Sequence, residues 1–279
     1  MRCVALSLPA LIRLRGGGRS DMRVGHIRGG GEGVKNLCWW ICRTVPRERE
    51  HYMKKGILEM KRLLLLALSL LVPNCASAVQ LYDLFPGTIH ASERYVIYSH
   101  GLIVEGSDPK PLSPKYGEYD FPAIKQSLFK DGGFNLIAHQ RPKSADDSYA
   151  DTLKSWVHRL IDAGVAPSRI TLVGFSRGAG LTAMASSGLS SAGINTALMA
   201  ICEDGEVSHA SGLNLGGNLL SIYETSDVLG GSCGKLAARS HLKSFKEVSI
   251  STGKKHGAFF QPLPEWIQPL KAWIAKTNR

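Results

Sequence analysis

Two kinds of hydrophobic pattern alternate along residues 79–279. Short runs rich in β-branched and aromatic residues predict strands at 94–99, 134–138, 169–175, 194–202, 219–225 and 245–251. Between several of these runs, apolar residues recur at helical spacing and predict helices at 121–131 and 147–163, around 179–185, and from Pro264 onward. This alternation predicts an α/β fold, with a mostly parallel, twisted sheet and helices on both of its faces.

The segment 147–163 has the clearest helical pattern. The apolar residues that define its face are Tyr149, Leu153, Trp156, Leu160 and Ile161. Asp147 or Ser148 would cap its start, and Gly164 follows its end. The last helix, from Pro264, carries an apolar face that favours packing on the sheet over contact with a membrane.

Residues 60–78 have the pattern of a secretory signal peptide. Met60-Lys61-Arg62 is a basic start, 63–72 is an apolar core, and Ala76-Ser77-Ala78 fits the A-x-A cleavage site. The alternative is a signal anchor that stays in the membrane, but the apolar core is short of the ~20 residues that span a bilayer. Cleavage would leave Val79–Arg279 as an exported protein, periplasmic or secreted, with no stable membrane span.

Residues 1–59 show neither helical nor strand periodicity, and they carry glycine clusters and scattered arginines. A signal peptide normally begins the chain. We therefore interpret 1–59 as a non-native upstream or disordered extension, with the true start at Met60 or Met53. A nucleic-acid-binding arm is not favoured, because no aromatic residues interleave with the basic ones in a regular way.

This division changes the meaning of the charge and of the cysteine count. The chain has a formal net charge of +11, but residues 1–78 hold 14 Lys/Arg against 5 Asp/Glu and residues 79–279 hold 20 against 18. A nearly neutral domain gives no argument for a nucleic-acid partner.

Only Cys202 and Cys233 follow the cleavage site. An even pair in an exported chain favours a disulfide, and two buried free thiols are the alternative.

The motif Gly174-Phe-Ser-Arg-Gly178 is the strongest candidate for chemistry. It follows the predicted strand 169–175 and leads into a predicted helix, which is the context of a nucleophile elbow with Ser176 exposed at a sharp turn. A second match, Gly230-Gly-Ser-Cys-Gly234, has no strand running directly into Ser232 and is interpreted as a loop.

A serine nucleophile needs a base within hydrogen-bond reach and an acid that orients the base. Asp227 follows the predicted strand 219–225, and His256 follows 245–251, which gives the order Ser, Asp, His with each residue after a strand. Asp204 and Glu203, at the end of the preceding strand, compete with Asp227 for the role of the acid. His256 is preferred over the other histidines on position alone.

With these residues in this order, Val79–Arg279 resembles the α/β-hydrolase superfamily, and 119–187 is similar to exported bacterial members of it. The resemblance implies that Ser176 is the nucleophile, His256 the general base and acid, and Asp227 the orienting acid. It also implies an oxyanion hole made by the backbone N–H groups of Arg177 and Leu102. The loop reads His100-Gly-Leu-Ile rather than H-G-G-G.

These features predict a serine hydrolase that cleaves carboxylic esters through an acyl-enzyme on Ser176, with a small-molecule ester as its substrate and no cofactor. The connection between the strands at 194–202 and 219–225 is short, so no large lid domain is expected. An acyltransferase or peptidase would use the same triad, and a non-catalytic binding protein could share the scaffold. The sequence does not indicate an oligomeric state.

Overall fold

The computed structural model describes residues 79–202 and 212–279. The predictions for 1–59 and 60–78, and the competing acids Glu203 and Asp204, lie outside these residues. Within the described part, no helix is both long enough and apolar enough to cross a bilayer.

A seven-stranded sheet forms the centre of the domain, with the strand order β1-β5-β2-β6-β7-β8-β9. Its strands are β1 (Leu81–Tyr82), β2 (Tyr95–Ser99), β5 (Asn135–Ile137), β6 (Ile170–Phe175), β7 (Asn195–Met199), β8 (Gly216–Glu224) and β9 (His241–Ile250). Every neighbouring pair in this sheet is parallel. A parallel sheet brings the carboxyl ends of all its strands to one edge, which is where this fold class places its sites.

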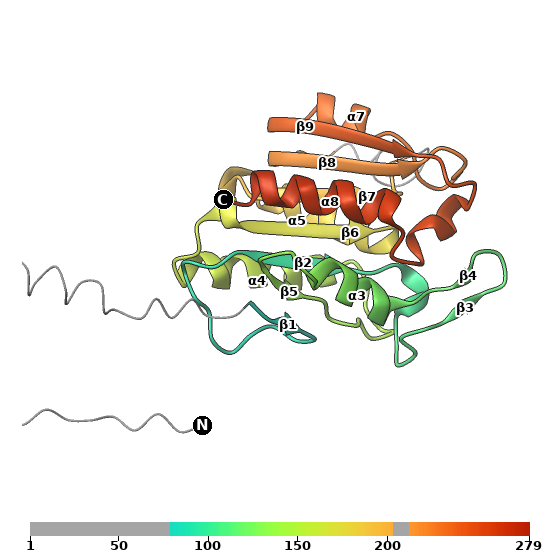
Figure 1. Cartoon of the computed structure of the whole chain (residues 1–279). Helices are drawn as coiled ribbons and strands as arrows, with labels where there is room; N and C mark the ends of the chain where they lie inside the picture. Colours follow the sequence, from blue (N-terminus) through green and yellow to red (C-terminus); the bar gives the residue numbers. More distant parts are fainter. Residues whose placement is uncertain (1–78, 203–211) are drawn as a thin grey trace, which may run out of the picture. The chain divides into compact units, whose positions relative to one another are not determined.

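Helices cover both faces of the sheet (Figure 1). The helices α3 (Phe121–Phe129) and α8 (Pro264–Thr277) lie on one face, and α4 (Tyr149–Asp162) and α5 (Arg177–Gly188) lie on the other. A short helix, α7 (Gly234–Ala238), packs near β9. The prediction of an α/β fold with helices on both faces is confirmed.

Alternation along the strands explains these two layers. In β2, Val96 and Tyr98 belong to the apolar cluster that α3 and α8 complete, while Tyr95 and Ile97 belong to the cluster that α4 and α5 complete. Because both faces are covered, all five residues of β2 are buried. The central strands therefore consist almost entirely of apolar residues, which is the pattern that the sequence presents.

The starts of α3 and α4 differ in their capping, and the predicted side-chain cap of α4 does not form. Asp120 caps α3, and its carboxylate accepts a hydrogen bond from the Ala123 amide at 2.9 Å. Ser148 occupies the cap position of α4, but its hydroxyl donates to Asp146 instead of capping the helix. The buried line of α4 runs through Ala150, Leu153, Val157 and Leu160. Tyr149, Trp156 and Ile161, predicted on the same face, pack at its partly buried edges.

The region between β2 and α3 contains structure that the sequence did not predict. A two-stranded antiparallel hairpin forms from β3 (Leu112–Ser113) and β4 (Gly117–Glu118), and it projects from the carboxyl-end side of the sheet (Figure 1). A 3-10 turn, η1 (Leu102–Val104), precedes it. The connection from β7 to β8 runs between Met199 and Gly216 and includes residues outside the described ranges, so the expectation of no large lid domain stays a prediction.

Candidate active site

Ser176 lies at the sharp turn between β6 and α5 and has a backbone conformation that L-residues rarely adopt. Its φ is 51° and its ψ is −123°. The turn is fixed on both sides: the Ser176 amide donates to the Met199 carbonyl at 2.9 Å, and its carbonyl accepts from Ala179 at 2.8 Å. Strain of this kind costs about 1–3 kcal/mol and persists where the surrounding structure holds it. The turn places the Ser176 hydroxyl at the carboxyl-end edge of the sheet.

Both glycines of the motif are required by close packing. A Cβ on Gly178 would lie 2.1 Å from the Ser99 carbonyl oxygen, and one on Gly174 would lie 2.4 Å from the Gly178 carbonyl oxygen. These glycines let the start of α5 pack directly against the end of β2. The serine turn and the loop after β2 are thereby held side by side.

The structure brings the three predicted side chains together. His256 Nε2 lies 2.9 Å from Ser176 Oγ, and His256 Nδ1 lies 2.7 Å from Asp227 Oδ2. The second carboxylate oxygen of Asp227 accepts a hydrogen bond from the Leu229 amide at 3.0 Å. The Asp227 carboxylate cannot donate, so Nδ1 carries the proton and Nε2 is left to accept from the serine hydroxyl.

Aromatic rings hold the imidazole of His256. Its ring centroid lies 4.9 Å from that of Phe175, 5.7 Å from that of Tyr116 and 6.4 Å from that of Phe260. His256 is only 6% exposed. Phe175 comes from the motif itself, but Tyr116 comes from the β3–β4 hairpin, whose contribution the sequence did not predict.

A pocket of about 220 Å³ opens beside Ser176. Its lining is mostly apolar: Gly101, Leu102, Ile103, Ser113, Tyr116, Tyr119, Phe175, Ser176, Leu229, His256 and Phe260. Leu102 is 58% exposed and Leu229 is 52% exposed, so the rim presents apolar side chains to solvent. Such a lining suits a small apolar group next to the hydroxyl.

The two residues predicted to donate to an oxyanion, Arg177 and Leu102, each begin a helix near Ser176. Arg177 is the first residue of α5, and Leu102 is the first residue of η1, so neither amide is used within its helix. In residues 79–202 and 212–279, neither donates a hydrogen bond to another group. These are the two donors that the resemblance to α/β-hydrolases implies, and their role stays a prediction.

A buried arginine, which the sequence did not predict, supports the loop that carries Leu102. The Arg141 guanidinium is fully buried and donates to Ser99 Oγ at 2.8 Å, to the His100 carbonyl at 2.5 Å and to Glu105 Oε1 at 3.2 Å. We call Ser99, His100, Glu105 and Arg141 the Arg141 cluster. Burial lowers the pKa of Arg141, and the Glu105 charge opposes that shift.

His100 belongs to this cluster through both ring nitrogens. Nε2 accepts from the Arg141 amide at 2.8 Å, and Nδ1 donates to the Gly101 carbonyl at 2.8 Å. Burial, and then the Arg141 charge, lower the pKa of His100 to about 3. The ring is therefore neutral, and its role is to fix the backbone next to Leu102.

A buried glutamate supports the other side of the site. Glu224 is 1% exposed at the end of β8, and its carboxylate accepts hydrogen bonds from Ser226, Thr252 and Gly253. We call these four residues the Glu224 cluster. Burial opposes the charge, but these hydrogen bonds outweigh it and place the pKa of Glu224 below its usual value. Ser226 adjoins Asp227, and Gly253 precedes His256 by three residues.

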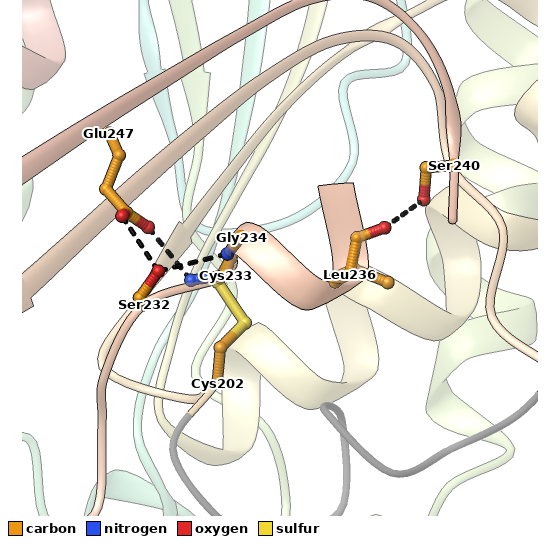
Figure 2. The surroundings of a disulfide bond; sticks show 7 residues. All are labelled: Cys202, Ser232, Cys233, Gly234, Leu236, Ser240 and Glu247. Atoms are coloured by element: carbon orange, nitrogen blue, oxygen red, sulfur yellow. Dashed lines mark hydrogen bonds between the residues drawn. A yellow bond between two sulfur atoms is a disulfide. The ribbon is translucent and has the colours of Figure 1, made fainter. Parts of the chain in front are cut away.

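A disulfide joins Cys202 and Cys233, as the sequence predicted (Figure 2). It connects the segment after β7 to the segment that follows Asp227. Figure 2 also shows Glu247 of β9 accepting hydrogen bonds from the Ser232 hydroxyl at 2.8 Å and from the Cys233 amide at 2.9 Å. Ser232 is a loop residue, as expected, and its hydroxyl is engaged by Glu247.

Within the described ranges, no group of three or more His, Cys, Asp or Glu residues could hold a metal ion. His139 and His241 lie outside the site and contact Tyr149 and Asn214 instead.

The α/β-hydrolase fold is defined by the parallel sheet, the strained serine after β6 and the Ser, Asp, His order along the chain.

No family model matches the chain, and no curated protein matches it. Solved structures that are similar to it include the Francisella virulence factor BioJ, at 13% identity and a TM-score of 0.47, over 67% of this chain and 78% of that one. An esterase from the bacterial hormone-sensitive lipase family is similar at 15% identity and 0.48, over 70% and 80%. The hormone-sensitive lipase homologue EstE7, from a metagenome library, is similar at 15% and 0.44, over 69% and 81%.

Proposed function

We propose that the protein is a serine hydrolase that cleaves carboxylic esters through an acyl-enzyme on Ser176. The observation that carries this proposal is the hydrogen-bonded chain from Ser176 through His256 to Asp227 at a strained turn. A structural turn serine needs neither a buried histidine aimed at its hydroxyl nor a carboxylate behind that histidine.

In the first half of the reaction, Ser176 Oγ attacks the ester carbonyl carbon while His256 Nε2 takes the hydroxyl proton. The carbonyl oxygen becomes an oxyanion and accepts hydrogen bonds from the amides of Leu102 and Arg177. The bond to the alcohol then breaks, and the leaving alkoxide takes the proton from Nε2. Asp227 holds the ring in position and stabilises its positive charge.

In the second half, a water molecule attacks the acyl-enzyme and gives its proton to His256 Nε2. The second tetrahedral intermediate breaks its bond to Ser176 Oγ, which regains the proton. The carboxylic acid leaves. The small apolar pocket favours short acyl groups, since its volume is about 220 Å³.

A fluorophosphonate probe tests the nucleophile, because it labels only activated serines. The protein should be labelled, and Ser176→Ala should not. Ser232→Ala is the matched control, since Ser232 lies in the second Gly-x-Ser-x-Gly match and bonds to Glu247; it should keep full labelling. Labelling that survives Ser176→Ala would refute Ser176 as the nucleophile. Absence of labelling in the unmodified protein would refute the hydrolase and favour a binding protein.

Hydrolysis of p-nitrophenyl esters of graded acyl length tests the substrate class. We expect kcat/KM to be highest for short acyl chains and to fall as the chain outgrows the pocket. Adding a competing alcohol separates hydrolysis from acyl transfer, because a transferase would form the new ester in preference to the free acid. Amide substrates of the same acyl group separate peptidase from esterase activity.

We also propose that the protein is exported, with cleavage after Ala78. The Cys202–Cys233 disulfide supports an oxidising compartment. N-terminal sequencing of the protein from the periplasm or the medium should begin at Val79. A mature chain that retains residues before 79, or a protein found wholly inside the cell, would overturn this.

A further inference from the structure

A second pocket adjoins the serine pocket, with a volume of about 490 Å³. It is lined by Lys115, Tyr116, Gly117, Glu118, Gly253, Lys254, Lys255, Gly257, Gln261 and Leu263. Tyr116 lines both pockets, so its ring is a wall that they share. The two pockets are therefore adjacent at Tyr116.

Three lysines and one carboxylate make the second pocket strongly positive. Lys115 comes from the β3–β4 hairpin, and Lys254 and Lys255 directly precede His256. Among residues 79–202 and 212–279, none of the three takes part in a salt bridge, whereas Lys110, Lys125 and Lys154 each pair with an aspartate. The pocket therefore gathers three lysines that have no ion-pair partner among the described residues, against one carboxylate, Glu118.

The lysine positions are set by structure as well as by composition. Lys255 has a φ of 53°, a left-handed conformation in which a glycine or asparagine is usual. The Lys115 ammonium lies 5.0 Å from the centre of the Tyr116 ring, at the wall between the pockets. Lys255 thus lies directly before His256, and the Lys115 ammonium lies beside the Tyr116 ring.

The two pockets differ in chemistry. Leu102, Ile103 and Leu229 line the serine pocket, and lysines dominate its neighbour. We propose that the lysine pocket is a subsite for an anionic oxyacid group on the substrate, such as a carboxylate or a phosphate. The substrate is then an ester with a short apolar group on one side and an anionic group on the other. This proposal rests on the proposed ester hydrolase activity.

Binding tests the subsite without turnover. In the Ser176→Ala protein, calorimetric titration with phenyl phosphate should detect binding, and the added substitutions Lys115→Gln, Lys254→Gln and Lys255→Gln should weaken it about tenfold, if each ion pair contributes a typical amount. The matched control is Lys243→Gln, Lys246→Gln and Lys276→Gln, which removes equal charge from exposed lysines elsewhere and should change binding less than twofold. No binding to the parent, or equal loss in both triple variants, overturns the subsite.

Turnover then tests its use. 4-Acetoxybenzoate and its neutral methyl ester differ only in the anionic group on the alcohol side, and mono-p-nitrophenyl succinate places the charge on the acyl side. The triple lysine variant should lower kcat/KM about tenfold for the anionic ester whose charge lies on the side that the lysine pocket binds. It should lower kcat/KM less than twofold for the neutral methyl ester. Equal losses for both would contradict the subsite. Failure of the unmodified protein on every ester would refute the proposed function, while the titration still decides the subsite.

The anionic group could belong to a soluble ester or to a lipid headgroup. Hydrolysis of phosphatidylglycerol in vesicles, compared with a short-chain phosphatidylglycerol that dissolves as monomers, separates these sources. Lysine-dependent activity on monomers alone indicates a soluble substrate, and activity that requires vesicles indicates a lipid surface. Phosphatidylglycerol cleavage that the lysine substitutions leave unchanged would count against the subsite.

Discussion

The two sides of Ser176 are supported by buried charges of opposite sign and different environment. The Arg141 cluster fixes the loop with Leu102 through a cation that is paired with Glu105. The Glu224 cluster fixes the loops with Asp227 and His256 through an anion that accepts only from neutral N–H and O–H groups. Both clusters satisfy their buried charge, but they do so with different partners.

This difference predicts that removing the buried charge of each cluster lowers the stability of the protein by a different amount. Taking away one member of a buried ion pair leaves the other charge without a partner in a low-dielectric interior. Taking away a charge that neutral donors satisfy leaves amides and hydroxyls unpaired, which costs less per group. The clusters also depend on different titratable groups, so they should respond to acid over different pH ranges.

The largest effect is expected for Arg141→Met. It leaves Glu105 buried without its ion-pair partner, and it removes donors from Ser99 and the His100 carbonyl. We expect a loss of about 3–5 kcal/mol in the free energy of unfolding, measured by urea denaturation. The double variant Arg141→Met/Glu105→Met should recover part of that loss. A loss below about 1 kcal/mol for the single variant would mean that the ion pair does not stabilise the loop.

Reduction of the Cys202–Cys233 disulfide should have the next largest effect. The bond closes a loop with a sequence separation of 31, for which chain entropy predicts about 3–4 kcal/mol. It lies on the Asp227 side, so the amides of Leu229 and Cys233 should exchange faster after reduction. Those of Glu105 and Arg141 should keep their protection.

Cys202→Ala/Cys233→Ala is the control for the reducing agent, because it should not respond to it. If both sets of amides lost protection equally on reduction of the unmodified protein, the two sides of the site would not be independent units.

Glu224→Gln should cost about 1.5–3 kcal/mol, because an amide keeps one accepting oxygen and places a donor against donors. The loops of Asp227 and His256 would shift, so kcat should fall more than KM rises. Glu265→Gln, an equal change at an exposed residue in the first turn of α8, should cost no more than about 1 kcal/mol and leave kcat unchanged. A fall in stability with an unchanged kcat would show that Glu224 supports the fold but does not position the site.

The pKa of Glu224 also sets the pH at which its cluster weakens. Its folded pKa lies below the ordinary 4.5. Its stabilising effect is therefore fully present above pH 4.5, and it is lost as the pH falls through the folded value. The difference in the free energy of unfolding between the parent and Glu224→Gln should shrink only below pH 4.5.

The sequence predicted the parts of the site that follow from strand order. Ser176, Asp227 and His256 each come after an apolar run, and parallel strands bring those ends to one edge. The two supporting charges could not be found in this way. Arginine and glutamate are usually exposed, and nothing in the sequence around Arg141 or Glu224 indicates burial.

The predicted strand boundaries were wrong where the hydrophobic pattern gives no information. β9 begins at His241 instead of near residue 245, because an edge strand with exposed polar residues lacks the apolar alternation that marks a buried one. β8 begins at Gly216, where glycines carry no pattern. The hairpin that contributes Tyr116 has strands of two residues each, which is too short for any period to appear.

The smallest effect is a pH dependence that should separate the two clusters. The pKa of His100 is about 3 in the folded protein, against an ordinary value of 6.5. Above pH 6.5, neither the folded nor the unfolded state binds the proton, so the stability due to neutral His100 is fully present. Below it, the unfolded state binds the proton first, and stability falls until the pH reaches about 3.

Between pH 7.5 and 5, this linkage amounts to about 2 kcal/mol. His100→Gln should therefore be less stable than the parent at pH 7.5, with a difference that narrows by about that amount by pH 5. Glu224→Gln should show no such narrowing over the same range, because the Glu224 carboxyl is ionised in both states there. The contrary result is a free energy of unfolding that changes equally with pH in the parent and in His100→Gln from pH 7.5 to 5. It would mean that His100 takes up a proton in the folded protein, and that the Arg141 cluster tolerates a second positive charge.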